Sequence, residues 1–370
     1  MKIFLVCNSL GEGGAERVHV NLANGFVQRG HEVWLVVDLT KKATYPVDER
    51  VRLLQLFPPK NNKILKWGGA IFKLRKYLRK YKPDVIIGNM HLCSFISRLA
   101  TIGIKVPVVL TIHHALESET YDMGWFINFC DRHAPSLYAA TTVLTEADKD
   151  VMENIYGRHS GIFVMPNPLT YIPAEKIPEK ECFVLAAGRI DQWQCKGWDI
   201  LLKAWGRLHA TVHTGEMAVE LKKWKLKIAG AGHEETFRML KDMAREYGVG
   251  ASVEFIGYQS DMMCLYKKAP VFCLSSRSEG LPMVLIEAMS QGCAPVATDY
   301  KGRTESIITD SETGFLCFPE DVEGLCEGLR KMIFDAPYRL EVQRNSIERA
   351  KCYVPDQIIS LWEKKLNQIV

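Results

Sequence analysis

Two glutamates, Glu279 and Glu287, stand eight residues apart in the stretch SRSEGLPMVLIEAMSQG, which is otherwise largely apolar. The apolar run before it indicates a buried strand, so Glu279 is expected in the loop beyond the carboxyl end of that strand. Pro282 favours the first turn of a following helix and Gly292 favours its end, so Glu287 falls inside the helix. A helix N-terminus attracts phosphate, and carboxylates accept hydrogen bonds from sugar hydroxyls. The pattern therefore predicts a site for a phosphorylated sugar compound.

Each glutamate taken alone also fits a purely structural interpretation. Glu279 would then be an acidic residue favoured near a helix dipole, and Glu287 would be a solvated helix position. The second half of this interpretation is the weaker one. Glu287 lies between Leu285–Ile286 and Ala288–Met289, with almost no other polar residue on the predicted helix.

The elements that must position these residues follow a repeated pattern. Short apolar runs alternate with helix-like segments, and the runs are nearly continuous, as expected for parallel strands covered on both faces. Three prolines in GIFVMPNPLTYIP predict a linker, after which the pattern restarts. We therefore predict an α/β protein with two doubly wound domains, residues 1–168 and 169–352. A last helix, about 353–370, is expected to return to the first domain, and ligands are expected in a cleft between the two.

Composition narrows the classes of partner. A net charge of +4 is mild, and no nucleic-acid-binding module is recognisable, so we expect no nucleic acid. Eleven cysteines without a CxxC spacing predict reduced thiols rather than a disulfide framework or a zinc site. The opening MKIFLVCNSLGEGG is too short in apolar residues for a signal peptide, and no stretch has the length of a membrane span. These features predict a cytoplasmic protein.

The loop GEGGAE partly matches a dinucleotide-binding fingerprint. Gly11, Gly13 and Asp38 occupy suitable places, but the third glycine position holds Glu16, whose side chain would obstruct close packing of helix and sheet. We therefore do not expect NAD to bind.

A second motif, Asp148–Lys149–Asp150, formally matches an Asp-x-Asp metal site. It lies where Thr145 and Asp148 predict a capping box at a helix start, and side chains two apart on a helix diverge. We therefore predict no metal site here.

Residues 60–82 contain nine Lys or Arg, no Asp or Glu, and interleaved apolar residues such as Trp67 and Phe72. This composition is typical of a basic amphipathic helix on an anionic membrane surface. A solvated helix covering the first domain fits equally well, and both interpretations remain open.

Several ordered motifs resemble the family-4 retaining glycosyltransferases of GT-B fold. They are GGAERVHVNLANGFVQRGHEV, VMPNPL, GRIDQWQCKGWDILLKAW, EFIGY and SEGLPMVLIEAMSQGCAPVATDYKGRTESIITDSETGFL, and they cover nearly the whole chain. The resemblance implies two Rossmann-like domains facing each other across a cleft. The acceptor would lie mainly on the first domain and the nucleotide-sugar donor on the second.

The resemblance also implies roles for individual residues. Glu287 would bind the ribose, Glu279 and His113 the transferred sugar, and the cations Arg189 and Lys196 the diphosphate. Gly13 and Gly14 would let the first loop approach the donor phosphate and the acceptor. The remaining contacts to the sugar and the diphosphate of the nucleotide sugar would come from Gly280 and from the backbone amides of Leu281, Pro282, Met283 and Val284. His91 and His114 receive no role.

The expected activity is retaining transfer of a hexose-type sugar from a UDP- or GDP-linked donor, without metal or cofactor. The acceptor would be a glycan or a lipid-linked compound in cell-surface polysaccharide or lipopolysaccharide synthesis, at the inner face of the plasma membrane. Two alternatives remain. One is a nucleotide-sugar epimerase or hydrolase of the same fold, and the other is a non-catalytic nucleotide-sugar binding protein.

Overall fold

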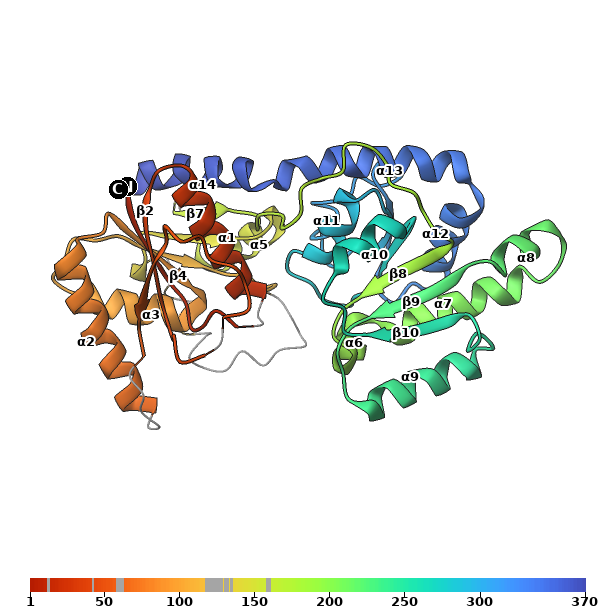
Figure 1. Ribbon diagram of the computed structural model, residues 1–370, viewed down its shortest axis with the longest axis horizontal. Coiled ribbons are helices and arrows are strands. Elements are labelled where there is room, and N and C mark those ends of the chain that lie inside the picture. Colours follow the sequence, from red (N-terminus) through yellow and green to blue (C-terminus); the bar gives the residue numbers. More distant parts are fainter. Residues whose placement is uncertain are drawn as a thin grey trace. The chain divides into compact units, whose positions relative to one another are not determined.

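The computed structural model describes residues 1–11, 14–41, 43–57, 63–116, 129, 133, 136–157 and 161–370. These residues form two compact units, which Figure 1 shows coloured along the chain. Unit 1 consists of Met1–Pro168 and Pro355–Val370, and unit 2 consists of Leu169–Val354. The last helix of the chain is therefore part of unit 1.

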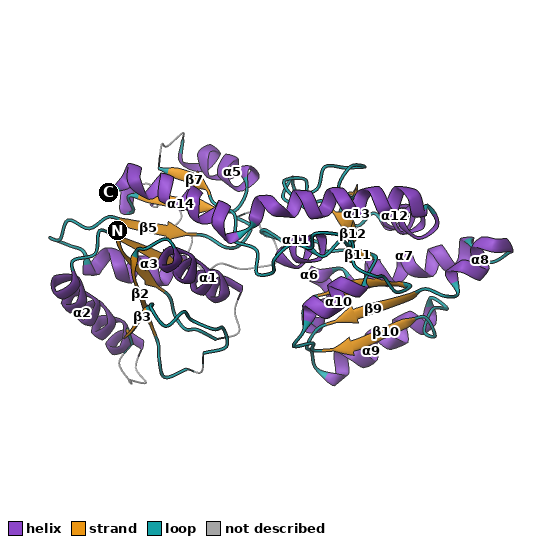
Figure 2. Cartoon of the chain, turned by 45° about the horizontal axis from the view of Figure 1, so that its top comes forward, coloured by secondary structure: helices purple, strands orange, loops and turns teal. Residues whose placement is uncertain are grey.

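Unit 1 is built on a parallel sheet with the strand order β3-β2-β1-β4-β5-β6-β7 (Figure 2). Apart from a charged or polar residue at one end of each, its central strands are apolar and buried because both faces of the sheet are covered, as the sequence predicts. The strands are β1 (Lys2–Val6), β2 (Glu32–Val37), β3 (Arg52–Gln55), β4 (Val85–Asn89), β5 (Val108–Thr111), β6 (Ala140–Val143) and β7 (Ile162–Val164).

Side chains that alternate along these strands pack into two separate hydrophobic cores, one on each face of the sheet. Ile3 and Leu5 pack with the helices of one face, and Phe4 and Val6 pack with those of the other. The first face carries α1 (Gly14–Gln28) and α14 (Pro355–Ile369), and the second carries α2 (Lys63–Tyr81) and α3 (Met90–Ala100). Helix α5 (Glu146–Tyr156) connects β6 to β7.

The C-terminal helix α14 lies against α1 (Figure 1). The contact is close at Gly25, where a Cβ would come within 2.6 Å of the Ile359 side chain. Arg29 pairs with Asp356 at 2.7 Å, and His31 Nε2 lies 2.8 Å from a carboxylate oxygen of Glu363. Apolar packing and these polar contacts together attach the end of the chain to unit 1.

One sequence-based expectation is corrected here. The three prolines of GIFVMPNPLTYIP predicted a linker, but the apolar residues before them, Ile162–Val164, form strand β7 and pair with β6. An edge strand of three residues is too short to leave a recognisable pattern, and the prolines directly after it dominate the local signal.

Unit 2 repeats the plan with a parallel sheet in the order β10-β9-β8-β11-β12-β13 (Figure 2). The strands are β8 (Phe183–Ala187), β9 (Lys225–Ala229), β10 (Val253–Gly257), β11 (Val271–Leu274), β12 (Ala294–Thr298) and β13 (Phe315–Cys317). The helices are η1 (Ile190–Gln192), α6 (Trp193–Lys196), α7 (Trp198–Thr211), α8 (Gly215–Leu221), α9 (Glu234–Glu246), α10 (Met262–Lys268), α11 (Met283–Ser290), α12 (Val322–Phe334), α13 (Ala336–Ala350) and η2 (Lys351–Tyr353).

In both sheets the chain reverses the direction in which it adds strands. In unit 1 it proceeds outward from β1 through β2 and β3 and then returns to place β4 on the other side of β1. In unit 2 the same reversal places β11 beside β8. The loops at the carboxyl ends of such neighbouring strands diverge and leave room for a ligand. The fold therefore directs attention to the loops after β8 and β11.

No helix in the described part of the chain combines the length and the apolar content that a membrane span requires.

Candidate functional site

Glu279 lies in the loop between β11 and α11, and two donors fix its carboxylate. The hydroxyl of Ser276 and the ammonium of Lys196 both donate to Oε1 at 2.7 Å. The Thr298 hydroxyl donates to the carbonyl of Ser276 at 2.7 Å and so ties this loop to β12. The direction of the Glu279 carboxylate is thus set by unit 2 itself.

Lys196 ends the short helix α6, beside the loop of Glu279. The helix stops because Gly197 adopts a left-handed φ of 63°, where a Cβ would lie 2.0 Å from the carbonyl oxygen of Ser275. Lys196 and Glu279 form a largely buried ion pair, with exposed side-chain fractions of 18% and 13%. Because an ammonium has three donors, Lys196 can hold Glu279 and a phosphate oxygen together.

Arg189 comes two residues after β8 and is exposed. Its carbonyl accepts a hydrogen bond from the indole N–H of Trp198 at 3.4 Å, which holds the backbone at this point. Its guanidinium makes no hydrogen bond or ion pair with any described residue. An arginine presented in this way at the carboxyl end of a strand is suited to bind phosphate in a bidentate manner.

Glu287 lies inside α11 and is only 2% exposed. The interpretation of Glu287 as a solvated helix position is therefore wrong. The hydroxyl of Tyr266, on α10, donates to Oε2 of Glu287 at 3.3 Å. A carboxylate kept away from bulk water in this manner is suited to accept hydrogen bonds from a ligand, because water competes little for it.

The first turn of α11 supplies backbone donors. The helix begins at Met283, with Pro282 as its N-cap and no capping side chain, so the amides of Met283 and Val284 have no partner within the helix. Pro282 itself has no N–H. The expectation that the whole stretch from Leu281 to Val284 donates amides is thus corrected, and Pro282 contributes only backbone geometry.

His113 follows β5 in unit 1, and both of its ring nitrogens have partners there. Nδ1 lies 3.1 Å from Asn167 Oδ1, and Nε2 lies 3.0 Å from Thr111 Oγ1. Thr111 Oγ1 is also 3.0 Å from the Gly88 carbonyl, so its single proton goes either to that carbonyl or to the ring. Burial lowers the pKa of His113 to about 4, and the ring is neutral at pH 7.

Three more histidines lie near this strand end, and with His113 they form what we call the histidine cluster: His19, His91, His113 and His114. The ring centroids of His19 and His113 are 5.7 Å apart, and those of His91 and His114 are 5.6 Å apart. Burial lowers the pKa of His19 and of His91 to about 3, and that of His114 to about 4. The histidine cluster is therefore uncharged at neutral pH.

The glycine loop of unit 1 is only partly described. Gly13 lies outside the described residues, and Gly14 is the first residue of α1. Asp38, the carboxylate of the partial dinucleotide fingerprint, accepts hydrogen bonds from Thr40, Gln55 and Lys66 at 2.7, 3.1 and 3.3 Å. Although burial opposes the shift, these hydrogen bonds lower the pKa of Asp38 to about 2. Because Asp38 is engaged by its own neighbours, the structure offers no support for a dinucleotide site.

The Asp-x-Asp triplet has the predicted capping role. The Thr145 hydroxyl accepts a hydrogen bond from the Asp148 amide at 3.2 Å and donates to Asp148 Oδ2 at 2.7 Å, at the start of α5. Asp148 is buried, whereas Asp150 is exposed. The two carboxylates thus occupy different environments and do not form a pair.

The basic segment becomes helix α2, while residues 60–62 lie outside the described part. Leu74 and Leu78 are buried in unit 1, so the main apolar stripe of the helix packs on the sheet. Arg75 is also structural, since it donates to the carbonyls of Ala100 and Ile102 at 2.9 and 2.6 Å. The outward side keeps its basic residues and the exposed side chains of Leu65 and Phe72, whereas the partly exposed Trp67 lies on the inward side, near the start of the helix.

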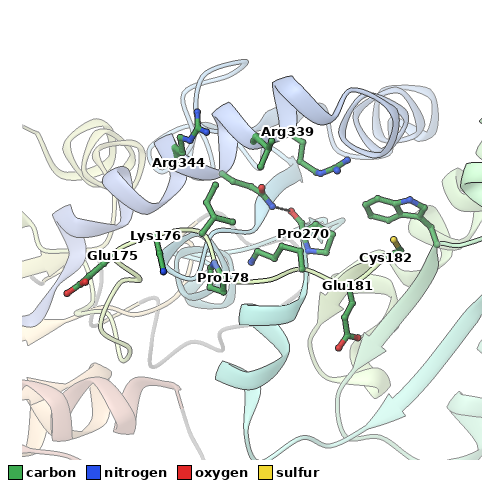
Figure 3. A pocket seen from close by; sticks show the side chains of 13 residues that line it. Glu175, Lys176, Pro178, Glu181, Cys182, Pro270, Arg339 and Arg344 are labelled. Carbon is green, nitrogen blue, oxygen red and sulfur yellow. Dashed lines mark hydrogen bonds between the residues drawn. The ribbon is translucent and has the colours of Figure 1, made fainter.

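A cavity of about 700 Å³ lies at the opposite end of the unit 2 sheet, where Cys182 and Pro270 precede β8 and β11 (Figure 3). Its polar groups are largely used within unit 2. Gln343 donates to the carbonyl of Pro270 at 2.9 Å, as the dashed line shows, and Arg339 donates to the carbonyls at the end of α12. Lys180 donates to the carbonyls of Tyr266 and Gln291 at 3.2 and 2.8 Å. This cavity is remote from the loops that carry the predicted residues.

Four contributors to these arrangements were missed by sequence reasoning. Tyr266 contacts Glu287, Asn167 contacts His113, and Ser276 and Arg277 belong to the loop that carries Glu279. Asn167 and Ser276 stand inside motifs that the sequence does single out, so their position was a usable signal. Tyr266 gave none, because it reaches its partner across 21 residues.

Two family models match the chain. The model described as Glycosyltransferase Family 4 matches residues 12–170, and the one described as Glycosyl transferases group 1 matches residues 170–351. Among curated relatives, the chain is 29% identical over 378 residues to a Campylobacter jejuni α-1,4-N-acetyl-D-galactosaminyltransferase. The match covers 100% of this chain and 99% of that enzyme, which is named for an undecaprenol-diphosphate-linked glycan.

Solved structures show the same fold. Sucrose-phosphate synthase from Thermosynechococcus elongatus superposes with a TM-score of 0.81 at 17% identity, covering 100% of this chain and 99% of that one. The Anabaena protein HepE in complex with UDP and glucose superposes with a TM-score of 0.77 at 18% identity, covering 99% of both chains. With both family models matching in order and both sheets of the fold in place, the chain belongs to the family-4 glycosyltransferases of GT-B fold.

Proposed function

We propose that this glycosyltransferase moves a hexose-type sugar from a UDP- or GDP-linked donor to a glycan or lipid-linked acceptor, with retention of anomeric configuration. The proposed pathway class is the synthesis of cell-surface polysaccharide or lipopolysaccharide. One observation carries the proposal. The loops after the adjacent strands β8 and β11, together with α11, bring cations, carboxylates and free helix amides to one end of unit 2: Arg189, Lys196, Glu279, Glu287 and the first turn of α11.

These groups match the parts of a nucleoside-diphosphate sugar. Glu287 would accept hydrogen bonds from the ribose hydroxyls, and Glu279 would do so from hydroxyls of the transferred sugar. The diphosphate between them would meet the amides of Met283 and Val284, with the ammonium of Lys196 and the guanidinium of Arg189 as counter-charges. The ion pair at 2.7 Å between Lys196 and Glu279 supports this order, because it places the diphosphate and sugar contacts side by side.

The reaction would proceed on one face of the sugar. The acceptor hydroxyl oxygen forms a bond to the anomeric carbon as the bond from that carbon to the phosphate oxygen breaks. The acceptor proton passes to the departing phosphate, and the leaving group is the nucleoside diphosphate. Arg189 and Lys196 stabilise the charge that grows on it, so no metal is needed for this purpose. His113, neutral and held by Asn167, would contact the sugar as a hydrogen-bonding group rather than as a base.

Relatives support the choice of substrates. HepE has been solved with UDP and with UDP-glucose, and TarM with UDP, which favours UDP as the nucleotide. Three Campylobacter jejuni relatives are named as N-acetylgalactosaminyltransferases acting on undecaprenol-linked diphosphate glycans. We therefore propose that the acceptor is a lipid-linked glycan at the cytoplasmic face of the membrane.

The test is an assay of sugar transfer with a panel of UDP- and GDP-sugars and undecaprenol-diphosphate glycans. We expect loss of donor only when acceptor is present, and an NMR coupling at the new anomeric centre that matches the donor. Loss of donor without acceptor would identify the epimerase or hydrolase alternative. Donor binding without any turnover, across the full panel, would favour the non-catalytic alternative.

The membrane partner is a separate proposal, and it rests on the outward side of α2. The exposed Leu65 and Phe72 lie on the same side of the helix as Lys76, Arg79 and Lys80. This side therefore combines apolar insertion with attraction to anionic lipids. Replacing these three cations by Glu should abolish sedimentation with vesicles that contain anionic lipid, at low salt. Arg75 is left intact because it stabilises α3.

In the matched control, three exposed lysines of unit 2 are replaced by Glu, which changes the net charge by the same amount. They are Lys222, Lys223 and Lys241. This control should sediment like the parent. Equal loss of sedimentation in both variants would show that net charge, not α2, governs vesicle binding.

A further inference from the structure

Arg277 lies between the two loops of the proposed donor site, and all of its side-chain donors are used. A guanidinium has five N–H groups. Two form a bidentate pair with Asp199 at 2.8 and 2.7 Å, and Nε and Nη2 both contact Glu320, the latter at 3.1 Å. The remaining N–H of Nη1 donates to the carbonyl of Gln194 at 2.6 Å. The guanidinium is thus saturated and has no donor left for a ligand.

The partners of Arg277 belong to three different segments. Gln194 lies in α6, which carries Lys196, and Asp199 is in the first turn of α7. Glu320 stands between β13 and α12 with a left-handed φ of 66°, which a residue with a Cβ adopts at some cost. Arg277 itself stands in the same loop as Glu279, two residues earlier. One side chain therefore joins the loop after β11 to the segment after β8 and to the loop after β13.

Backbone contacts align the same two loops. The amide of Arg277 donates to the carbonyl of Cys195 at 2.8 Å, and the Ser275 hydroxyl donates to the carbonyl of Lys196 at 2.9 Å. These bonds hold the two backbones side by side, but each has a single donor and acceptor. The fork of Arg277 adds a planar, two-sided contact that resists rotation of one loop against the other.

We propose that Arg277 is a positioning residue that fixes the separation between Lys196 and Glu279, and so the register between the diphosphate and the transferred sugar. The inference rests on the proposed donor site and adds to it a residue that contacts no substrate. Its effect on the reaction is indirect. A displacement of about 1 Å between reacting groups can cost roughly 100-fold in rate, so loop alignment matters even where binding survives.

A positioning role depends on the shape of the guanidinium, whereas charge balance would depend only on its positive charge. Lysine keeps the positive charge but has three donors on one nitrogen in place of a planar fork of five, so it cannot replace all of the hydrogen bonds to Asp199, Glu320 and the Gln194 carbonyl. Arg277→Lys and Arg277→Met should therefore both lower kcat for the full donor by about 10- to 100-fold. The nucleoside monophosphate lacks the outer phosphate and the sugar. Its affinity should change less than about twofold, because the Arg277 side chain makes no hydrogen bond to Glu287 or to α11.

Matched controls come from an ordinary surface pair. Arg330 pairs with Glu327 within one helix at 3.0 Å, with both side chains about half exposed, and its replacement by Lys or Met should leave all values unchanged. A second test avoids any general damage to the fold. Glu320→Gln alters an exposed loop residue and should lower kcat less than Arg277→Lys does. Introduced into Arg277→Lys, it should cause no further decrease in kcat.

The outcomes are separable. Parent kcat in Arg277→Lys would overturn the positioning role, as would a parallel loss of melting temperature and monophosphate affinity. If Lys196→Ala abolishes transfer while Arg277→Lys does not affect it, only this inference fails. If Lys196→Ala transfers like the parent, the proposed donor site itself is wrong.

Discussion

The two units have the same sheet plan but different chemistry at the carboxyl ends of their central strands. In unit 1 these ends carry the histidine cluster, whose rings burial keeps neutral. In unit 2 they carry ion pairs, Lys196 with Glu279 and Arg277 with both Asp199 and Glu320. Polar but uncharged side chains suit contacts with hydroxyl groups, whereas fixed cations suit a diphosphate. On this difference we base the proposal that the acceptor binds unit 1 and the charged donor binds unit 2.

The largest effect should come from removing a cation of unit 2. Arg189→Ala and Lys196→Ala should each lower kcat for transfer about 100- to 1,000-fold, because the departing diphosphate loses a preorganised counter-charge. Steady-state rates with saturating donor provide the measurement. Lys223→Ala is the matched control, since Lys223 is exposed and pairs only with Glu220 in the described part of unit 2. If both variants transferred sugar at the rate of the parent, the cations of unit 2 would not be needed for the reaction, and the proposed difference between the units would be wrong.

A second experiment separates the two carboxylates of unit 2. Hydrogen bonds to a charged group contribute about 1.5–3 kcal/mol, so Glu287→Gln should weaken binding of free nucleoside diphosphate roughly 10- to 150-fold. Glu279→Gln should leave that affinity nearly intact and lower turnover of the whole donor. Calorimetric titration beside the transfer assay tests both statements. Unchanged nucleotide affinity in a folded Glu287→Gln variant would return Glu287 to a structural role.

Tyr266→Phe sharpens the same experiment. The change removes the hydroxyl that donates to Glu287 and keeps the buried ring, so its effect on nucleotide affinity should be smaller than that of Glu287→Gln. A larger effect from Tyr266→Phe would mean that the tyrosine acts in some way other than through Glu287.

Lowering the pH should destabilise unit 1 more than unit 2. A histidine of the histidine cluster takes up a proton near pH 6.5 when unfolded, but only near pH 3–4 when folded. The stability gained from the neutral rings is therefore complete above pH 6.5 and is lost as the pH falls towards 4, by up to roughly 1.4 kcal/mol per pH unit for each ring. Unit 1 should lose hydrogen-exchange protection before unit 2. His19→Phe removes one titrating ring and should therefore reduce the acid-induced loss of hydrogen-exchange protection in unit 1.

The smallest expected effect is that of a chelator. Because Arg189 and Lys196 are proposed to supply the counter-charge, EDTA should leave the transfer rate unchanged, and added Mg²⁺ or Mn²⁺ should not raise it. The rate is compared before and after dialysis against EDTA. Complete loss of transfer, restored by either ion, would show that the cations of unit 2 are insufficient by themselves.

The sequence determined the local elements around the site because their signals are local. The apolar strand, Pro282 and Gly292 predict a helix after β11, and the structure has α11 at Met283–Ser290, with Gly292 in a left-handed φ of 72° just beyond it. Thr145 and Asp148 predict the cap that starts α5, and the prediction is confirmed. The overall arrangement of two doubly wound α/β halves is confirmed for the same reason, since buried parallel strands read as continuous apolar runs.

Only the tertiary structure decided how these elements meet. The pairing of Lys196 with Glu279 joins residues 83 positions apart, and that of Arg277 with Asp199 joins residues 78 apart. Tyr266 reaches Glu287 from another helix, and Leu74 and Leu78 turn the apolar stripe of α2 inward. Such contacts depend on which strands become neighbours and on which face of a helix is covered. A linear pattern records neither, because strand order follows from packing of the whole sheet and not from any one segment.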